Sequence, residues 1–146
     1  MSDEKIAGIM RSLSSSLEKK DLETALSFFT EDATWVTPDG TFKGKENIRR
    51  YLKWEFDTVQ DEKVTESGNG IIVQGNKSFY EHVITSTVEG KKNEFLAMCA
   101  YEFSDDKIKH VRTVYDRLSV AKQLAKGWLA RWIVNSVANP FEKRLR

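Results

Sequence analysis

The first third of the chain carries apolar residues at the three- and four-residue steps of amphipathic helices. Over residues 2–19 these positions fall on one stripe, which predicts a first helix. A second helix begins at Asp21, whose side chain suits an N-cap, and a third begins at Gly44. The inward stripe of the third helix consists of Ile48, Tyr51, Leu52, Glu55, Phe56 and Val59.

The pattern then changes to runs rich in β-branched and aromatic residues. A short strand is expected at 33–37, followed by a turn at 38–40. Beyond the third helix, turn signals delimit four more strands: 63–66 with 71–74, 77–89, 92–103 and 107–117. Strands joined by such tight turns form an antiparallel meander, so helices followed by a curled sheet predict an α+β domain.

From Ser119 onward the spacing becomes helical again. Gly127 is a weak point in this helix, and Pro140 is expected to close it. We therefore divide the chain into a domain at 1–118 and an amphipathic helical extension at 119–146, which packs on the domain or on a dimer partner. The apolar stripe of the extension consists of Val120, Leu124, Trp128, Leu129, Trp132, Ile133 and Val137.

Composition narrows the class of protein. The 146 residues suit one domain, and a net charge of +1 argues against a nucleic-acid-binding protein. Residues 119–146 hold six basic residues and one acidic residue, so the helix suits an anionic membrane surface, but a role in covering the sheet or a neighbouring subunit is favoured. The lone Cys99 and the absence of a signal-peptide pattern predict a cytoplasmic protein.

Several familiar site signatures are missing. The segment from Gly40 to Lys45 has three residues between its glycines where a phosphate-binding loop needs four. His82, His110 and Cys99 lack a zinc-binding spacing, and there is no Gly-x-Ser-x-Gly elbow. We therefore expect no metal and no cofactor.

Polar residues embedded in the strands are the catalytic candidates. Because residues two apart share a face, His110, Arg112 and Asp116 lie on one side of the last strand, as do Tyr80 and His82 on an earlier one. If both sets meet on the concave side, a cavity there contains the carboxyl of Asp116, the guanidinium of Arg112 and one or two histidine imidazoles. Periodicity does not say which side is concave. Alternatively, Asp116 pairs with Arg112 at the sheet rim, and the histidines are ordinary strand residues.

Four aromatic residues are core residues by default, but they favour a flat, apolar ligand if a cavity exists. These residues are Trp35, Tyr51, Tyr80 and Tyr101.

Three segments resemble the nuclear transport factor 2-like superfamily, and within it the SnoaL-like, ketosteroid isomerase-like proteins. They are residues 21–35, residues 40–48 and the strand 108–116 with the Gln123-Leu124 pair after it. The resemblance implies a cone-shaped, curved antiparallel sheet wrapped around the N-terminal helices, a cystatin-like α+β roll, with an extra C-terminal helix. It also implies a pocket at the open end and a homodimer.

The resemblance implies a function less specifically than a fold. Thr37 stands before Pro38 where ketosteroid isomerases have their catalytic base, and Leu13 stands near their helix-1 tyrosine, which argues against steroid isomerisation. Asp116 matches the acidic residue that similar cyclases and epoxide hydrolases keep late in the last long strand.

Two functional hypotheses follow. In the first, the protein is an acid/base isomerase, cyclase or hydrolase for a small apolar cyclic molecule. Asp116 then moves a proton, His82 or His110 relays it, and Arg112 stabilises an oxyanion. In the second, the same fold is a non-catalytic ligand-binding or dimeric protein-interaction module.

Overall fold

Three helices precede a six-stranded sheet, and two helices follow it. The computed structural model describes residues 1–144, with side chains up to residue 139. The helices are α1 (Asp3–Glu18), α2 (Leu22–Ser27), α3 (Lys45–Thr58), α4 (Arg117–Leu124) and α5 (Gly127–Arg144). The strands are β1 (Phe29–Thr37), β2 (Gly40–Lys43), β3 (Val59–Gln74), β4 (Lys77–Val88), β5 (Lys91–Ser104) and β6 (Lys107–Tyr115).

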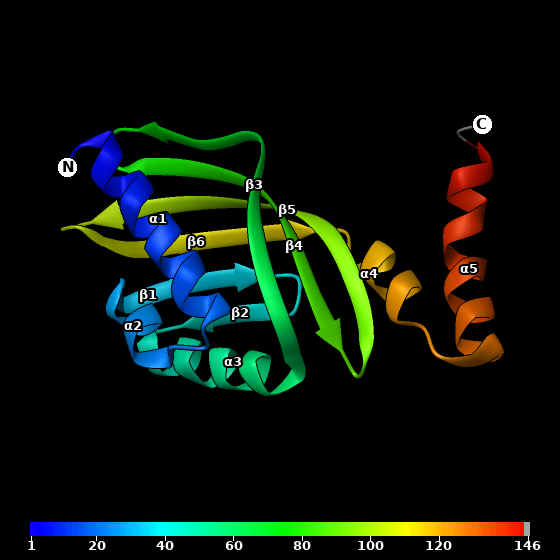
Figure 1. The fold of residues 1–146 in the computed structure, drawn as a ribbon. Coiled ribbons are helices and arrows are strands. Elements are labelled where there is room, and N and C mark those ends of the chain that lie inside the picture. The colour runs from blue at the N-terminus through cyan, green and yellow to red at the C-terminus, as the bar shows by residue number, and fades with distance from the viewer. Residues whose placement is uncertain (145–146) are drawn as a thin grey trace.

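The strands form one curved, mixed sheet in the order β2-β1-β6-β5-β4-β3. Strands β3 to β6 form the predicted antiparallel meander. The short strand β2 was not expected, and β1 pairs with β6 in parallel rather than antiparallel. The α+β class and the N-terminal helices on a curved sheet are confirmed (Figure 1).

The core forms where α1 crosses the sheet (Figure 1). The Ser2 side chain caps this helix by accepting a hydrogen bond from the Lys5 amide at 3.3 Å. Behind it, Ile6, Met10 and Leu13 are fully buried in one cluster with residues of β1, α3 and β6. Burying each large apolar side chain contributes about 1.5–3 kcal/mol to stability. The largest buried side chains are Phe29, Ile6, Met10, Leu13, Leu26, Ile48, Leu52, Ile108 and Val111.

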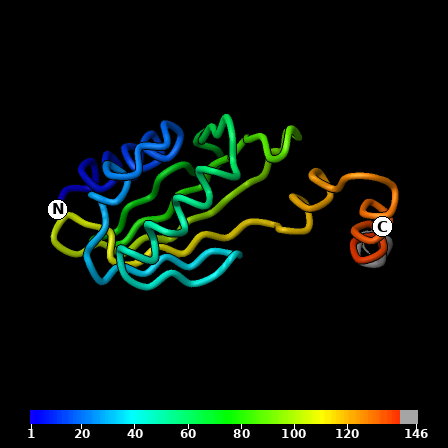
Figure 2. The backbone as a smooth tube through the Cα atoms, turned by 90° about the horizontal axis from the view of Figure 1, so that it is seen from below, coloured from blue at the N-terminus to red at the C-terminus, as the bar shows by residue number. Residues whose placement is uncertain are grey.

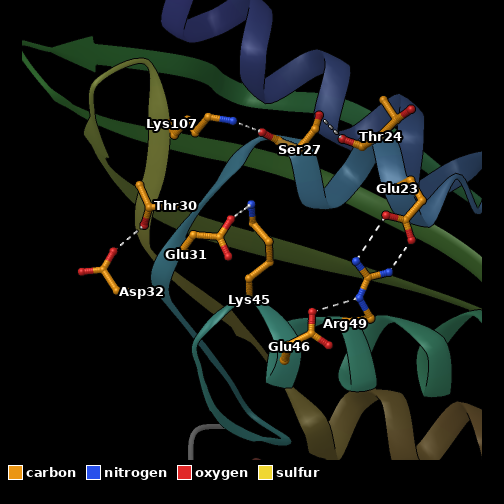
Figure 3. A network of polar contacts seen from close by, with 10 residues as sticks. All are labelled: Glu23, Thr24, Ser27, Thr30, Glu31, Asp32, Lys45, Glu46, Arg49 and Lys107. Carbon is orange, nitrogen blue, oxygen red and sulfur yellow. Dashed lines mark hydrogen bonds and ion pairs between the residues drawn. The ribbon is translucent and has the colours of Figure 1, made fainter.

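Polar contacts fasten α3 to the elements beside it (Figure 3). Arg49 donates hydrogen bonds to both Glu23 of α2 and Glu46 of its own helix. Lys45 donates to Glu31 of β1 at 2.6 Å. These contacts tie the outer side of α3 to α2 and β1, so the opposite side, with Tyr51 and Glu55, is held toward the sheet.

The C-terminal extension is two helices rather than one. The helical spacing is interrupted at residues 125–126, and Gly127 has a φ of +75°, a left-handed conformation that glycine adopts without strain. Helix α4 packs on β5, whereas α5 packs against α4 and stands apart from the sheet (Figures 1 and 2).

The apolar face of α5 is largely exposed, and the helix differs from the prediction at its end. Trp128 and Trp132 are 79% and 63% exposed. The helix runs past Pro140 to Arg144, and residues 145–146 of the predicted extension lie outside the described residues. Within residues 1–144, no helix is both long and apolar enough to cross a membrane.

The core assignment makes a prediction about stability. Leu13→Ala should lower the free energy of unfolding by about 2–5 kcal/mol, because it leaves a cavity among close-packed side chains. Ile72→Ala is the matched control, since Ile72 is 50% exposed on β3. Urea denaturation measures both. Equal, small effects of the two substitutions would contradict the described core.

Candidate functional site

A cavity of about 490 Å³ lies between the concave face of the sheet and the helices α3 and α4. Apolar and aromatic side chains make up most of its wall. Val120, Ala121 and Leu124 of α4 close one side, so the first helix of the extension is part of the site. Its size and mostly apolar wall are typical of small-molecule sites.

Three of the four predicted aromatic residues line this cavity: Trp35, Tyr51 and Tyr101. Trp35 donates a hydrogen bond from Nε1 to Thr113 Oγ1 at 3.0 Å, and its ring meets that of Tyr51 edge-on at 5.6 Å. Tyr80 is buried in the core below the cavity wall, with its ring 4.3 Å from that of His82. The indole N–H of Trp35 is therefore already paired within the protein.

Strand β6 turns the opposite face toward the cavity from the one expected. Thr113 and Tyr115 line the cavity, whereas His110 and Arg112 alternate with them and lie on the outer face. Arg112 pairs with Glu102 of β5 at 3.1 Å, not with Asp116. The expectation that His110 and Arg112 face the cavity together with His82 is therefore corrected.

Asp116 also lies outside the cavity lining. Its Oδ1 accepts hydrogen bonds from the amides of Leu118 at 2.9 Å and Ser119 at 3.1 Å, and it is the N-cap of α4. The side chain is exposed. Its expected inward orientation is wrong because a helix begins directly after β6, and the carboxylate satisfies the amides of the first turn.

His82 lies on the concave face of β4, one of the two alternatives that the periodicity left open. Its side chain is 5% exposed, lines the cavity, and has an Nδ1 with no hydrogen-bond partner among the described residues. Burial lowers the pKa of His82, so the ring is neutral at neutral pH.

Two glutamates that the sequence did not single out line the same cavity. Glu55 lies one turn after Tyr51 on the inward stripe of α3. Burial and the nearby charges of Glu62 and Asp39 raise the pKa of Glu55. Burial and Glu18 raise the pKa of Glu62, although Lys20 opposes this shift. A carboxyl with such a raised pKa holds its proton at pH values where an ordinary glutamate is ionised.

A β-bulge directs Glu62 into the cavity. On β3 the pairing advances three residues from Gln60 to Lys63 while β4 advances two, so β3 holds one extra residue. Asp61, in this bulge, has a φ of +52° and is exposed. The extra residue shifts the alternation of the strand, and Glu62 takes the inward position that Asp61 would otherwise occupy.

Polar side chains of Asp39, Tyr115 and Arg117 form one edge of the cavity. The Tyr115 hydroxyl donates to Asp39 Oδ2 at 3.0 Å, and Arg117 lies 3.6 Å from Asp39 Oδ1. Arg117 also donates to the Pro38 carbonyl at 3.0 Å. Asp39, Tyr51 and Trp54 also line a second, more open hollow over α3 and β2.

The chemistry available in the cavity is proton transfer. Cys99 is buried beside Thr113 at 3.3 Å, and burial raises the pKa of its thiol to about 11, so it is not a reactive thiolate. Among residues 1–139, no cluster of three or more histidine, cysteine or acidic side chains is arranged to hold a metal ion. The candidates for proton transfer among the groups that line the cavity are the carboxyls of Glu55 and Glu62 and the imidazole of His82.

Comparisons with known structures match the fold. A protein from Catenulispora acidiphila DSM 44928 with a ketosteroid isomerase-like fold, in complex with trimethylamine, is 18% identical, with a TM-score of 0.72 over 79% of this chain and 90% of that chain. An NTF2-like protein of unknown function from Burkholderia pseudomallei K96243 is 14% identical, with a TM-score of 0.76 over 86% of this chain and 100% of that one.

An LEH-like epoxide hydrolase from M. tuberculosis is 16% identical, with a TM-score of 0.71 over 92% of this chain and 96% of that chain. At these identities the likeness concerns the fold alone. No curated protein matches the chain. The SnoaL-like domain model matches residues 10–111, which include α3 and most of the sheet around the cavity. The chain therefore belongs to the SnoaL-like domain family.

Proposed function

We propose that the protein is an acid/base enzyme, an isomerase, cyclase or hydrolase, that acts on a small apolar cyclic molecule in the cavity. The observation that carries this proposal is a pair of carboxyls, Glu55 and Glu62, held in a largely apolar cavity with raised pKa values. Titratable groups perturbed in this way are frequent in active sites. The similar fold of an epoxide hydrolase supports the hydrolase alternative only at the level of the fold.

In this proposal the two carboxyls have different roles. Loss of one proton from the pair leaves a negative charge that hinders loss of the second, so one pH provides both an acid and a base. Lys20 favours the ionised form of Glu62, whereas no basic group does so for Glu55. Glu62 therefore takes a proton from a substrate carbon or from water, and Glu55 donates one to a substrate oxygen. Neutral His82 orients the substrate.

Glu55→Gln tests this assignment, because it preserves the shape of the side chain and removes its transferable proton. We expect the activity to fall by about a hundredfold to ten-thousandfold. The measurement is deuterium incorporation from D₂O into 2-tetralone, an enolisable cyclic ketone, and hydrolysis of cyclohexene oxide. Glu66→Gln is the control, since Glu66 is exposed on β3 and pairs with Arg11 at 2.6 Å.

The control should retain full activity with whichever probe the native protein converts. Conversion of neither probe above the solvent rate, or full activity in Glu55→Gln, would contradict the enzyme proposal. The second candidate, a ligand-binding or protein-interaction module, then takes its place. The exposed apolar face of α5 favours that candidate, because such faces commonly contact another molecule.

We also propose that the protein is a cytoplasmic homodimer in which a second copy covers the exposed face of α5. Two exposed apolar surfaces on the same chain support the dimer. Leu96, Met98 and Val114 are exposed on the outer face of the sheet, and Trp128 and Trp132 on α5. Residues 119–146 are basic and residues 1–118 carry more acidic than basic residues, so the extension of one copy attracts the body of the other.

Sedimentation of the chain with and without residues 127–146 tests the dimer. We expect a dimer for the full chain and a monomer for the truncated chain, which retains α4 and its part of the cavity wall. A monomeric full chain that pellets with anionic phosphatidylserine vesicles, while the truncated chain does not, would replace the dimer with a membrane-surface role.

A further inference from the structure

Carboxyl groups outnumber basic groups in the cavity wall. Asp39, Glu55 and Glu62 contribute three carboxyl groups. Among the described residues that line the cavity, Arg117 is the only arginine or lysine, and it is already engaged by Asp39 and the Pro38 carbonyl. A ligand that enters this cavity therefore meets three carboxyl groups and, among the described lining residues, no arginine or lysine that is free to neutralise them.

His82 independently indicates a missing partner. Its side chain is about 95% buried and lines the cavity, yet Nδ1 makes no hydrogen bond within the described part of the chain. Buried polar atoms without a partner are rare, and each calls for an explanation. A neutral imidazole has one ring nitrogen that donates and one that accepts, so a polar group of a ligand supplies the partner that Nδ1 lacks.

The rest of the wall suits a positive charge with an apolar body. Aromatic faces attract cations through their negative π-electron density, most strongly where water is excluded. The aromatic residues that line the cavity are Trp35, Tyr51, Trp54, Phe95, Tyr101 and Tyr115.

We propose that the ligand of this cavity is an organic ammonium ion, a ring-sized apolar body that carries one protonated amine. The ammonium group donates hydrogen bonds to Glu55 and Glu62, a third N–H group is available to His82, and the apolar body lies against the aromatic wall. This inference rests on the proposed function only in taking the cavity as the working site. It names a class of ligand for that site, and it does not depend on which proton Glu55 moves.

Binding of the cation couples to proton release. An ammonium ion beside the carboxyls favours the ionised form of the pair, so it displaces one proton, from Glu62, whose ionised form Lys20 already favours. Affinity for the amine should therefore increase as pH rises through the neutral range, while the amine itself stays protonated. The titratable groups around the pair are Glu18, Lys20, Asp39, Tyr51, His82, Tyr115 and Arg117.

Calorimetric titration with two probes of one shape tests the proposal: cyclohexylmethanamine, which is cationic, and cyclohexylmethanol, which is neutral. We expect the amine to bind at least about tenfold more tightly than the alcohol, since the alcohol lacks the charge. Titrations in two buffers of different ionisation enthalpy should reveal proton release with the amine alone. The preference should grow between about pH 6 and about pH 8.

Glu62→Gln should reduce the preference for the amine about tenfold or more and leave alcohol binding unchanged, because the amide has no charge to offer. Glu66→Gln, on the same strand outside the cavity, should behave as the native protein. Circular dichroism confirms that both variants fold. Equal affinity for the two probes, binding of neither, or an unchanged preference in Glu62→Gln would overturn the proposal.

This result is separable from that of the enzyme proposal. If the alcohol binds as well as the amine but Glu55→Gln abolishes proton exchange, the ligand class is wrong and the acid/base function stands. If the amine binds selectively and Glu55→Gln leaves turnover intact, the ligand class stands and the assigned role of Glu55 is wrong.

Discussion

The site depends on one electrostatic constraint, which is that two carboxyl groups share a largely apolar cavity. Among the described groups, Lys20 is the only cation that lowers the pKa of either carboxyl, and it does so for Glu62. Removing a carboxylate from water without a paired charge is costly, so burial raises the pKa of both groups and the pair retains a proton, on Glu55, at neutral pH. The protein maintains this arrangement because its sheet and helices fix the backbone on both sides of the pair. The cavity can thereby hold a proton ready at neutral pH, and the same negative potential selects what binds.

The architecture around the pair follows from this constraint. Arg49 and Lys45 hold the outer side of helix α3 against α2 and β1 (Figure 3). The inner side of the helix, which carries Glu55, therefore faces the cavity. The bulge at Asp61 turns Glu62 inward from β3. Helix α4 closes the wall, and Asp116 stabilises its first turn. Asp116 thus contributes to the site by starting the helix that covers it rather than by contacting a ligand.

Much of the fold could be predicted from the sequence, because helices and hairpins are encoded by local patterns. The parallel pairing of β1 with β6 could not, since it joins segments about 70 residues apart with no turn between them to fix it. The site was harder to predict. Alternation places Thr113 and Tyr115 opposite His110 and Arg112, but it does not say which face is concave. Glu62 was out of reach because a bulge reverses the alternation without a clear signal in the residues.

Other signals were present in the sequence. Glu55 stands among apolar residues on the stripe of α3, and an acidic residue in that position indicates either a buried partner or a functional site. Asp116 directly precedes a helical pattern, which is the signature of an N-cap. Taken together, the two signals indicate Asp116 as the residue that caps a helix and Glu55 as the candidate acid of the site.

The protonation state of the carboxyl pair is the central claim, and infrared difference spectroscopy measures it directly. Spectra of the native protein minus those of Glu55→Gln and Glu62→Gln, recorded at neutral pH, isolate the carboxyl vibrations of each residue. The account predicts a protonated C=O stretching band that is present in the native protein and lost in Glu55→Gln. Difference spectra with only ionised carboxylate bands at neutral pH would contradict it.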